Sequence, residues 1–252
     1  MVLVVAHRGY SGKYPENTIL ALKKAVEAGA DGVEFDIRAT QDSKLVVFHD
    51  EGLKRMCGVK GSISKLKYSE VQHLKAHGEP IPLLKDTLQY LASTDLKFII
   101  LEVKVEDYEE ELLEIVWGAK LQDRVIISSY YKSVLMKIRS LDTEIRLAYV
   151  MDNRPDRWRT LRTLTKDVEL FSVHPFHHRT ISTSLFMSQA KASGLHVLAW
   201  CLLGYKDLNR MKKLRKLGVD GIITDFPEEV RDFLKTPDEP VRPLHRRILR
   251  MK

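Results

Sequence analysis

The sequence predicts an α/β fold with the architecture of a (β/α)8 barrel, or TIM barrel. Eight short runs rich in β-branched residues are each followed by a helical pattern, an alternation that is typical of a parallel sheet covered by helices. The length of 252 residues suits that barrel, which usually needs about 250 residues. An internal repeat supports it, because residues 22–36 align with residues 211–225. An open, doubly wound sheet is the structural alternative.

The elements follow one another in a regular order. The predicted strands are Val2–Ala6, Gly32–Ile37, Lys97–Val103, Arg124–Ser128, Ile145–Val150, Val168–Val173, Leu195–Trp200 and Val219–Thr224. The helices that follow them are predicted near Thr18–Ala28, Leu83–Ala92, Tyr108–Ala119, Lys132–Leu141, Pro155–Thr165, Ser182–Ser193, Lys206–Leu217 and Pro227–Leu234. In each copy of the repeat a helix ends at a glycine, Gly29 or Gly218, and an Asp-Gly turn leads into a strand. The repeat is therefore a unit of the barrel scaffold.

One connection is much longer than the others. Residues 38–82 separate the second strand from its helix and predict a small insertion that covers one side of the barrel mouth. Its first part is expected to be a hairpin with a two-residue loop at Asp42-Ser43, which would place Asp36 opposite His49. A short helix is expected at Ser69–Ala76. The predicted domains are one catalytic barrel over residues 1–240, with the insertion 38–82, and a basic tail over residues 241–252.

Composition and charge exclude several classes of protein. The net charge is +7, but the tail holds five lysines and arginines and no acid, which leaves +2 for the rest of the chain and argues against a nucleic-acid-binding face. No run of 18 or more apolar residues predicts a membrane span, and no secretory signal is expected. Two isolated cysteines, Cys57 and Cys201, form neither a disulfide framework nor a zinc site. A cytoplasmic protein is therefore expected.

Three carboxylates are predicted to meet at the mouth of the barrel, where catalytic groups of this fold lie. Glu34 and Asp36 are two residues apart at the end of one strand, so their side chains point to the same face. Glu102 ends the next strand of the barrel. Three acids held together repel one another unless a cation binds, and an all-oxygen site suits Mg²⁺, Ca²⁺ or Mn²⁺ better than zinc. One divalent cation is therefore the expected cofactor.

Basic side chains accompany these acids. Arg8 and Lys104 are predicted at strand ends beside the carboxylates, which favours an anionic substrate such as a phosphate ester. His7 and His49 can act there as general base and general acid. The site thus has the groups that phosphodiester hydrolysis requires.

The motifs that hold these residues resemble the glycerophosphodiester phosphodiesterase family. They occur in the family's order and spacing, and they are His7-Arg8-Gly9, Pro15-Glu16-Asn17-Thr18, Glu34-Phe35-Asp36, His49-Asp50 and Glu102-Val103-Lys104. The resemblance runs from Ala6 to Asp225 and implies a (β/α)8 barrel. It implies metal binding by Glu34, Asp36 and Glu102, acid–base catalysis by His7 and His49, phosphate contacts by Arg8 and Lys104, and a site completed by Asn17 and Trp200.

The sequence departs from the family pattern at two places. Ser43 replaces the glycine that is usual in the hairpin turn, and Cys201-Leu202-Leu203 replaces the common Thr-Val-Asn after Trp200. The second departure concerns the part of the site that would hold the alcohol.

Several of these residues also have a structural interpretation. Asn17 precedes Thr18 and an apolar run, which favours a helix N-cap. Trp200 could pack in the core. His174 ends the sixth strand and could reach the mouth, although His174-Pro175 could merely terminate the strand.

The activity expected from this sequence is hydrolysis of glycerophosphodiesters to sn-glycerol 3-phosphate and an alcohol. A lysophospholipase D that acts on single-chain lipids is one alternative, and a catalytically silent barrel that binds anionic surfaces is another. The expected partner is a small phosphodiester, with no nucleic acid, and the chain is expected to be a monomer or homodimer. Apolar residues alternate with cations in the tail, so a weak membrane-surface contact is also possible there.

Overall fold

Eight parallel strands close into a barrel. The computed structural model describes residues 2–152, 156–176, 184–201 and 208–235. The barrel strands are β1 (Leu3–His7), β2 (Gly32–Ala39), β6 (Phe98–Val103), β7 (Val125–Ser129), β8 (Arg146–Met151), β9 (Ser172–Pro175), β10 (His196–Cys201) and β11 (Gly221–Thr224). Each strand pairs with the next in this order, and β1 pairs with both β11 and β2, which closes the ring. The predicted barrel is confirmed, and the open sheet is excluded.

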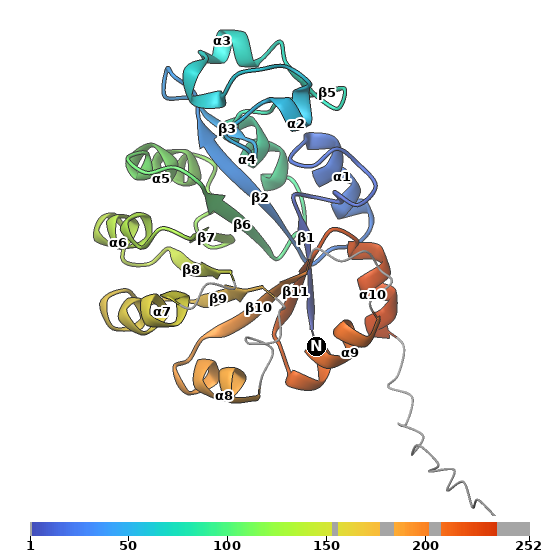
Figure 1. Ribbon diagram of the computed structural model, residues 1–252, viewed down its shortest axis with the longest axis vertical. Helices are drawn as coiled ribbons and strands as arrows, with labels where there is room; N and C mark the ends of the chain where they lie inside the picture. The colour runs from blue at the N-terminus through green and yellow to red at the C-terminus, as the bar shows by residue number, and fades with distance from the viewer. Residues whose placement is uncertain (1, 153–155, 177–183, 202–207, 236–252) are drawn as a thin grey trace, which may run out of the picture.

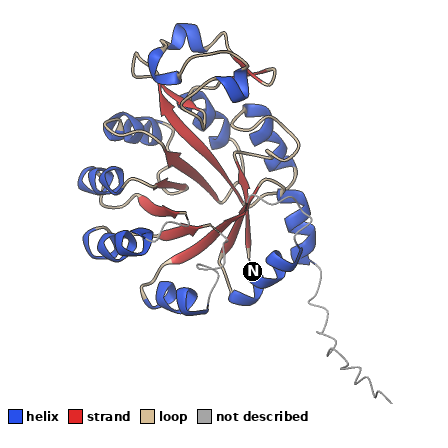
Figure 2. Cartoon of the chain, in the orientation of Figure 1, coloured by secondary structure: helices blue, strands red, loops and turns tan. Residues whose placement is uncertain are grey.

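Helices surround the ring of strands, as Figures 1 and 2 show. They are α1 (Ile19–Glu27), α4 (Leu84–Ala92), α5 (Glu109–Gly118), α6 (Lys132–Leu141), α7 (Asp156–Asp167), α8 (Ser184–Ala192), α9 (Leu208–Leu217) and α10 (Pro227–Lys235). No helix in the described ranges is both long and apolar enough to span a bilayer. The basic tail, residues 241–252, lies outside the described residues, as do residues 202 and 203 of the segment after Trp200.

Within the described residues, the predicted boundaries agree with the observed ones to within about two residues, except at the start of β9. The predicted helix starts at Pro155, Ser182 and Lys206 lie outside the described residues. The strand predicted for β9 begins at Val168, but the Val168 N–H donates to the Leu164 carbonyl (2.7 Å) and so belongs to the end of α7. Ser172 is the first residue of β9. An apolar residue that closes a helix is as buried as one that opens a strand, so hydrophobicity alone misplaces this boundary.

Side chains on the barrel strands alternate between two cores. On β2, Val33, Phe35 and Ile37 pack outward in the core shared with the helices. Glu34 and Asp36, between them, point into the barrel and are buried. Lower in the barrel the lumen is apolar. The acids therefore replace apolar side chains only at the carboxyl ends of the strands.

The insertion between β2 and α4 is a small packed unit at one edge of the barrel (Figure 1). It contains β3 (Leu45–Val47), α2 (Lys54–Cys57), a 3₁₀ turn at Ile63–Lys65, α3 (Tyr68–Val71), β4 (Lys75–Ala76) and β5 (Glu79–Pro80). It has a core of its own, formed by Val46, Phe48, Leu53, Met56, Ile63, Val71, Ala76 and Ile81.

The helix predicted at Ser69–Ala76 is wrong in its second half. The α-helix ends at Val71, and β4 pairs with β5. His77 and Gly78 between these strands both have positive φ, 49° and 94°, as a two-residue hairpin turn requires.

The predicted register of the first hairpin is wrong by one residue. Arg38 lies opposite Val46, so Asp36 falls opposite Phe48 instead of His49, and the Phe48 N–H donates to the Asp36 carbonyl (3.0 Å). The loop has three residues because the Thr40 N–H donates to the Lys44 carbonyl (3.0 Å) and Ser43 adopts a left-handed φ of 61°. Strand β3 ends at Val47. Strand alternation therefore does not place the side chain of His49.

Candidate active site

One pocket lies at the carboxyl ends of the barrel strands and gathers most of the predicted site. Its lining residues are His7, Arg8, Glu34, His49, Glu102, Lys104, Tyr130, Val150, His174, Trp200 and Ile223. Asp36 and Asn17, the other predicted residues, are buried next to it.

Glu34, Asp36 and Glu102 form a cluster whose geometry fits a metal ion. Each offers one carboxylate oxygen, and these oxygens all lie within 4.8 Å of one another. Glu34 Oε1 is buried and has no hydrogen-bond partner in the part of the chain that the structure describes. A buried carboxylate oxygen without a partner is costly unless a cation binds it. The residues present therefore fit a hard divalent cation with oxygen ligands.

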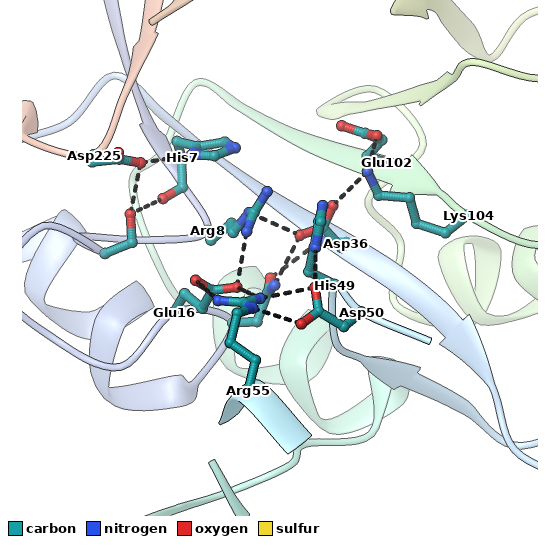
Figure 3. Close-up of polar contacts among 12 residues, drawn as sticks. His7, Arg8, Glu16, Asp36, His49, Asp50, Arg55, Glu102, Lys104 and Asp225 are labelled. Carbon is teal, nitrogen blue, oxygen red and sulfur yellow. Dashed lines mark hydrogen bonds and ion pairs between the residues drawn. The ribbon is translucent and has the colours of Figure 1, made fainter. Parts of the chain in front are cut away.

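Two basic side chains lie against these acids (Figure 3). The side chain of Arg8 reaches Asp36, with Nε 3.2 Å from Oδ2, whereas it is the backbone N–H of Arg8 that donates to Glu34 Oε2 (3.0 Å). Lys104 Nζ contacts Glu102 and lies 3.1 Å from Asp36 Oδ1. Both cations also line the pocket, where they can meet an anionic group.

Burial and neighbouring charges shift the pKa values of Glu34 and Asp36 in opposite directions. Burial, and then the neighbouring charge of Asp36, raises the pKa of Glu34 to about 8. Burial also acts to raise the pKa of Asp36, but Lys104 and Arg8 hold that pKa well below its usual value. In the absence of further positive charge, Glu34 is the acid that takes up a proton. A divalent cation would compete with that proton.

Asn17 holds Asp36 in place, and Thr18 caps α1. Asn17 Nδ2 donates to Asp36 Oδ2 (2.8 Å), and the Asp36 N–H donates to Asn17 Oδ1 (3.2 Å). The cap is Thr18, whose hydroxyl accepts from the Ala21 N–H (3.1 Å). The N-cap interpretation of Asn17 was wrong by one residue, because both side chains have the polar oxygen that a cap needs. Asn17 itself has a left-handed φ of 59°, and its amide contacts Asp36 on β2.

His7 is paired with an acid from the other end of the chain. His7 Nδ1 lies 2.6 Å from Asp225 Oδ1, at the end of β11, and Ser11 Oγ lies 2.9 Å from the same oxygen. Burial acts to lower the pKa of His7, but the hydrogen bond to Asp225 and the charge of Glu34 raise it on balance. The sequence placed Asp225 at a strand end without a role. Its pairing with His7 follows only from the closure of the barrel.

His49 has a different environment. Its Nδ1 lies 2.6 Å from Asp50 Oδ1. Burial, together with the charges of Arg8 and Lys104, lowers its pKa, although Asp36 acts in the opposite direction. The two histidines therefore reach the same pocket with their pKa values shifted in opposite directions.

The far wall of the pocket contains His174 and Trp200, for which the sequence left both a site role and a structural role open. Burial lowers the pKa of His174 to about 3, so its ring is neutral, and its Nε2 lies 3.0 Å from Ser172 Oγ. Trp200 lines the pocket, packs on Phe176 and donates its indole N–H to the Met151 carbonyl (3.2 Å). Its core and site interpretations are thus compatible.

Comparisons with known proteins agree with this geometry. The model of the glycerophosphoryl diester phosphodiesterase family matches residues 7–229. A glycerophosphodiester phosphodiesterase of Caldanaerobacter subterraneus subsp. tengcongensis is 31% identical, over 92% of this chain and 98% of its own.

Two solved structures have similar folds. The glycerophosphodiester phosphodiesterase of Thermotoga maritima is 32% identical with a TM-score of 0.77, over 93% of this chain and 98% of that one. An Oleispira antarctica phosphodiesterase, solved in complex with the product sn-glycerol-3-phosphate, is 27% identical with a TM-score of 0.80, over 93% and 97% of the two chains.

Proposed function

Because the chain belongs to the glycerophosphoryl diester phosphodiesterase family, we propose that it hydrolyses glycerophosphodiesters to sn-glycerol 3-phosphate and an alcohol. The observation that carries the proposal is one pocket lined by two carboxylates, two basic side chains and two histidines, with the third carboxylate of the cluster, Asp36, buried beside it. The product complex of the Oleispira antarctica relative supports the same substrate class.

We assign the cation site to Glu34, Asp36 and Glu102, with Mg²⁺, Ca²⁺ or Mn²⁺ as the ion. When bound, such an ion supplies positive charge that binds the phosphate and offsets charge that develops in the reaction. Asn17 keeps Asp36 oriented through its two amide contacts.

The basic side chains and the histidines have separate roles in the proposed reaction. Arg8 and Lys104 bind the phosphate oxygens and balance the charge that builds up around phosphorus. One of His7 and His49 removes the proton of the attacking hydroxyl, and the other gives a proton to the departing alcohol. Asp225 and Asp50 fix the two rings by accepting from their Nδ1 atoms, which leaves each Nε2 for the pocket.

The glycerol part of the substrate decides between this activity and that of a lysophospholipase D, because a lysolipid has an acyl chain there while both substrates can release the same alcohol. The strands β8, β9 and β10 lead to residues 153–155, 177–183 and 202–207, which lie outside the described residues. The described wall of the pocket includes the apolar side chains of Trp200 and Val150. The lysolipid activity is therefore an outcome of the assay below.

The test is product analysis with purified protein. Glycerophosphocholine and lysophosphatidylcholine are incubated with Mg²⁺, Ca²⁺ or Mn²⁺, or with chelator, and sn-glycerol 3-phosphate, lysophosphatidate and choline are measured. Release of sn-glycerol 3-phosphate with a divalent cation supports the proposal. Release of lysophosphatidate alone would favour lysophospholipase D, and no release from either substrate with any cation would refute both activities. Glu102→Gln serves as the matched variant and should lose the cation-dependent rate.

A further inference from the structure

Arg55, in the insertion, contacts two acids at once. It lies on α2, and its guanidinium uses all three nitrogens (Figure 3). Nε and Nη2 donate to the two oxygens of Asp50 (2.5 and 3.0 Å). Nη1 and Nη2 donate to the two oxygens of Glu16 (2.9 and 2.7 Å). Both contacts are two-pronged, which a planar guanidinium can make and an ammonium cannot.

One of these acids leads to Arg8. Glu16 lies in the loop after β1, 39 positions from Arg55, and its Oε1 also accepts from Arg8 Nη1 (2.8 Å). Arg8 in turn is 3.2 Å from Asp36. Glu16 thus links Arg55 to Arg8, whose guanidinium faces the proposed phosphate site.

The other acid leads to His49. Asp50 Oδ1 accepts from Arg55 and also lies 2.6 Å from His49 Nδ1. A carboxylate at this distance keeps the proton of a neutral imidazole on Nδ1, so Nε2 is the atom free to act in the pocket. The backbone at His49 is also fixed, because Arg38 Nε donates to the His49 carbonyl (2.8 Å).

Residues on either side of Arg55 are packed into the core of the insertion. The neighbouring Met56 is buried in the insertion core with Leu53. The Cys57 N–H donates to the Leu53 carbonyl (2.8 Å), and Gly58 ends α2 in a left-handed conformation, φ 72°. The Arg55 side chain is about half exposed, with 47% of its surface accessible, so it contributes little to the core. Its contacts are directed at the two acids.

We propose that Arg55 is a positioning residue, through which the insertion sets the orientation of both His49 and Arg8. The proposal rests on the proposed function, in which these two side chains meet the substrate. On this view the insertion is part of the catalytic apparatus and does more than cover the mouth. Arg8, which binds the phosphate, and His49, one of the acid–base groups, are then both oriented through acids that Arg55 contacts.

The test compares Arg55→Lys with Arg139→Lys. Lysine keeps the charge at position 55 but cannot make two-pronged contacts with both acids. Arg139 is the control, because it donates to the carbonyls of Asp142, Ile145 and Glu169 (3.1, 2.9 and 2.8 Å) near the end of α6, away from the pocket. Its replacement measures the effect of losing an arginine's hydrogen bonds elsewhere in the barrel.

Two readouts are combined. The first is kinetic: glycerophosphocholine is compared with a glycerophosphodiester that releases nitrophenolate, a leaving group that needs little protonation. We expect Arg55→Lys to lower kcat/KM by about 10- to 100-fold and to change the ratio of the two rates in the same direction as His49→Ala. Arg139→Lys should leave the rates and their ratio unchanged.

The second readout does not depend on activity. Imidazole ¹⁵N chemical shifts, assigned with His49→Gln, should place the His49 proton on Nδ1 in the wild type and in Arg139→Lys, and on a mixture of both nitrogens in Arg55→Lys. An unchanged tautomer and an unchanged rate ratio in Arg55→Lys would overturn the proposal, whatever the melting temperature. If the wild type cleaves neither substrate but the tautomer depends on Arg55, the proposed function fails and the positioning of His49 stands.

Discussion

Asn17→Gly tests whether the amide of Asn17 serves Asp36 or the substrate. Glycine keeps the left-handed backbone that Asn17 adopts, φ 59°, so the replacement removes the amide without adding backbone strain. Asp36 then loses a hydrogen bond to its buried carboxylate, worth about 1.5–3 kcal/mol, and the acceptor for its N–H, worth about 1–3 kcal/mol. The lower ends of these ranges apply, because water from the pocket can replace part of the amide. We expect the free energy of unfolding to fall by about 2.5 kcal/mol.

The same replacement should weaken the cation site. Asp36 loses the partner that orients it, so the affinity for Mn²⁺ should fall by about 10- to 100-fold. Urea denaturation measures the first effect, and calorimetric titration of Mn²⁺ in the absence of substrate measures the second. Thr18→Ala is the control: it removes the cap of α1, at about 1 kcal/mol, and should leave the Mn²⁺ affinity unchanged. An Asn17→Gly protein with wild-type stability and Mn²⁺ affinity but a raised KM would refute this reasoning and make Asn17 a substrate contact.

Three further outcomes are expected. Asp225→Asn should lower kcat by about 100-fold or more with little change in KM, because the amide no longer fixes the proton of His7 on Nδ1; steady-state kinetics checks this. Ser43→Gly should raise the melting temperature by about 1–4 °C, because glycine adopts the left-handed turn conformation without strain, and calorimetry measures the shift. Deletion of residues 241–252 should leave the turnover of water-soluble diesters unchanged, because every proposed site residue lies upstream; a loss confined to vesicle-bound lysolipid would indicate a membrane contact through the tail.

The barrel and the cluster of acids were predictable because they depend on periodic and local patterns. Strands of this fold end at one rim, so residues that end strands meet there. Glu34 and Asp36 share a face by simple alternation, and Glu102 ends the adjacent strand. The sequence positions alone therefore determined which acids converge.

The predictions that were wrong, the hairpin register and the N-cap of α1, depend on the backbone conformation of turns. The hairpin register changed by one residue because Ser43 adopts a positive φ and lengthens the loop to three residues. Asn17 and Thr18 are adjacent and both able to cap, so only the backbone conformation shows which one does. These choices involve differences of about 1 kcal/mol, which residue type does not resolve.

Side-chain contacts between residues far apart in the sequence were also not predicted. His7 and Asp225 are 218 positions apart, and Arg55 and Glu16 are 39 positions apart. Hydrophobic periodicity carries no information about such side-chain contacts. The strand-end position of Asp225 was a usable signal for the first pair, because β1 and β11 must be neighbours in a closed barrel. No comparable pattern marks Arg55, which lies in an irregular insertion.

The most direct test of the account is the position of a cation and a phosphate in the pocket. A crystal structure with Mn²⁺ and sn-glycerol 3-phosphate would locate the metal by its anomalous scattering. We predict one Mn²⁺ bound by Glu34, Asp36 and Glu102, with the phosphate between His7 and His49. A Mn²⁺ peak away from these three carboxylates, or a phosphate bound beyond the reach of both histidines, would contradict it.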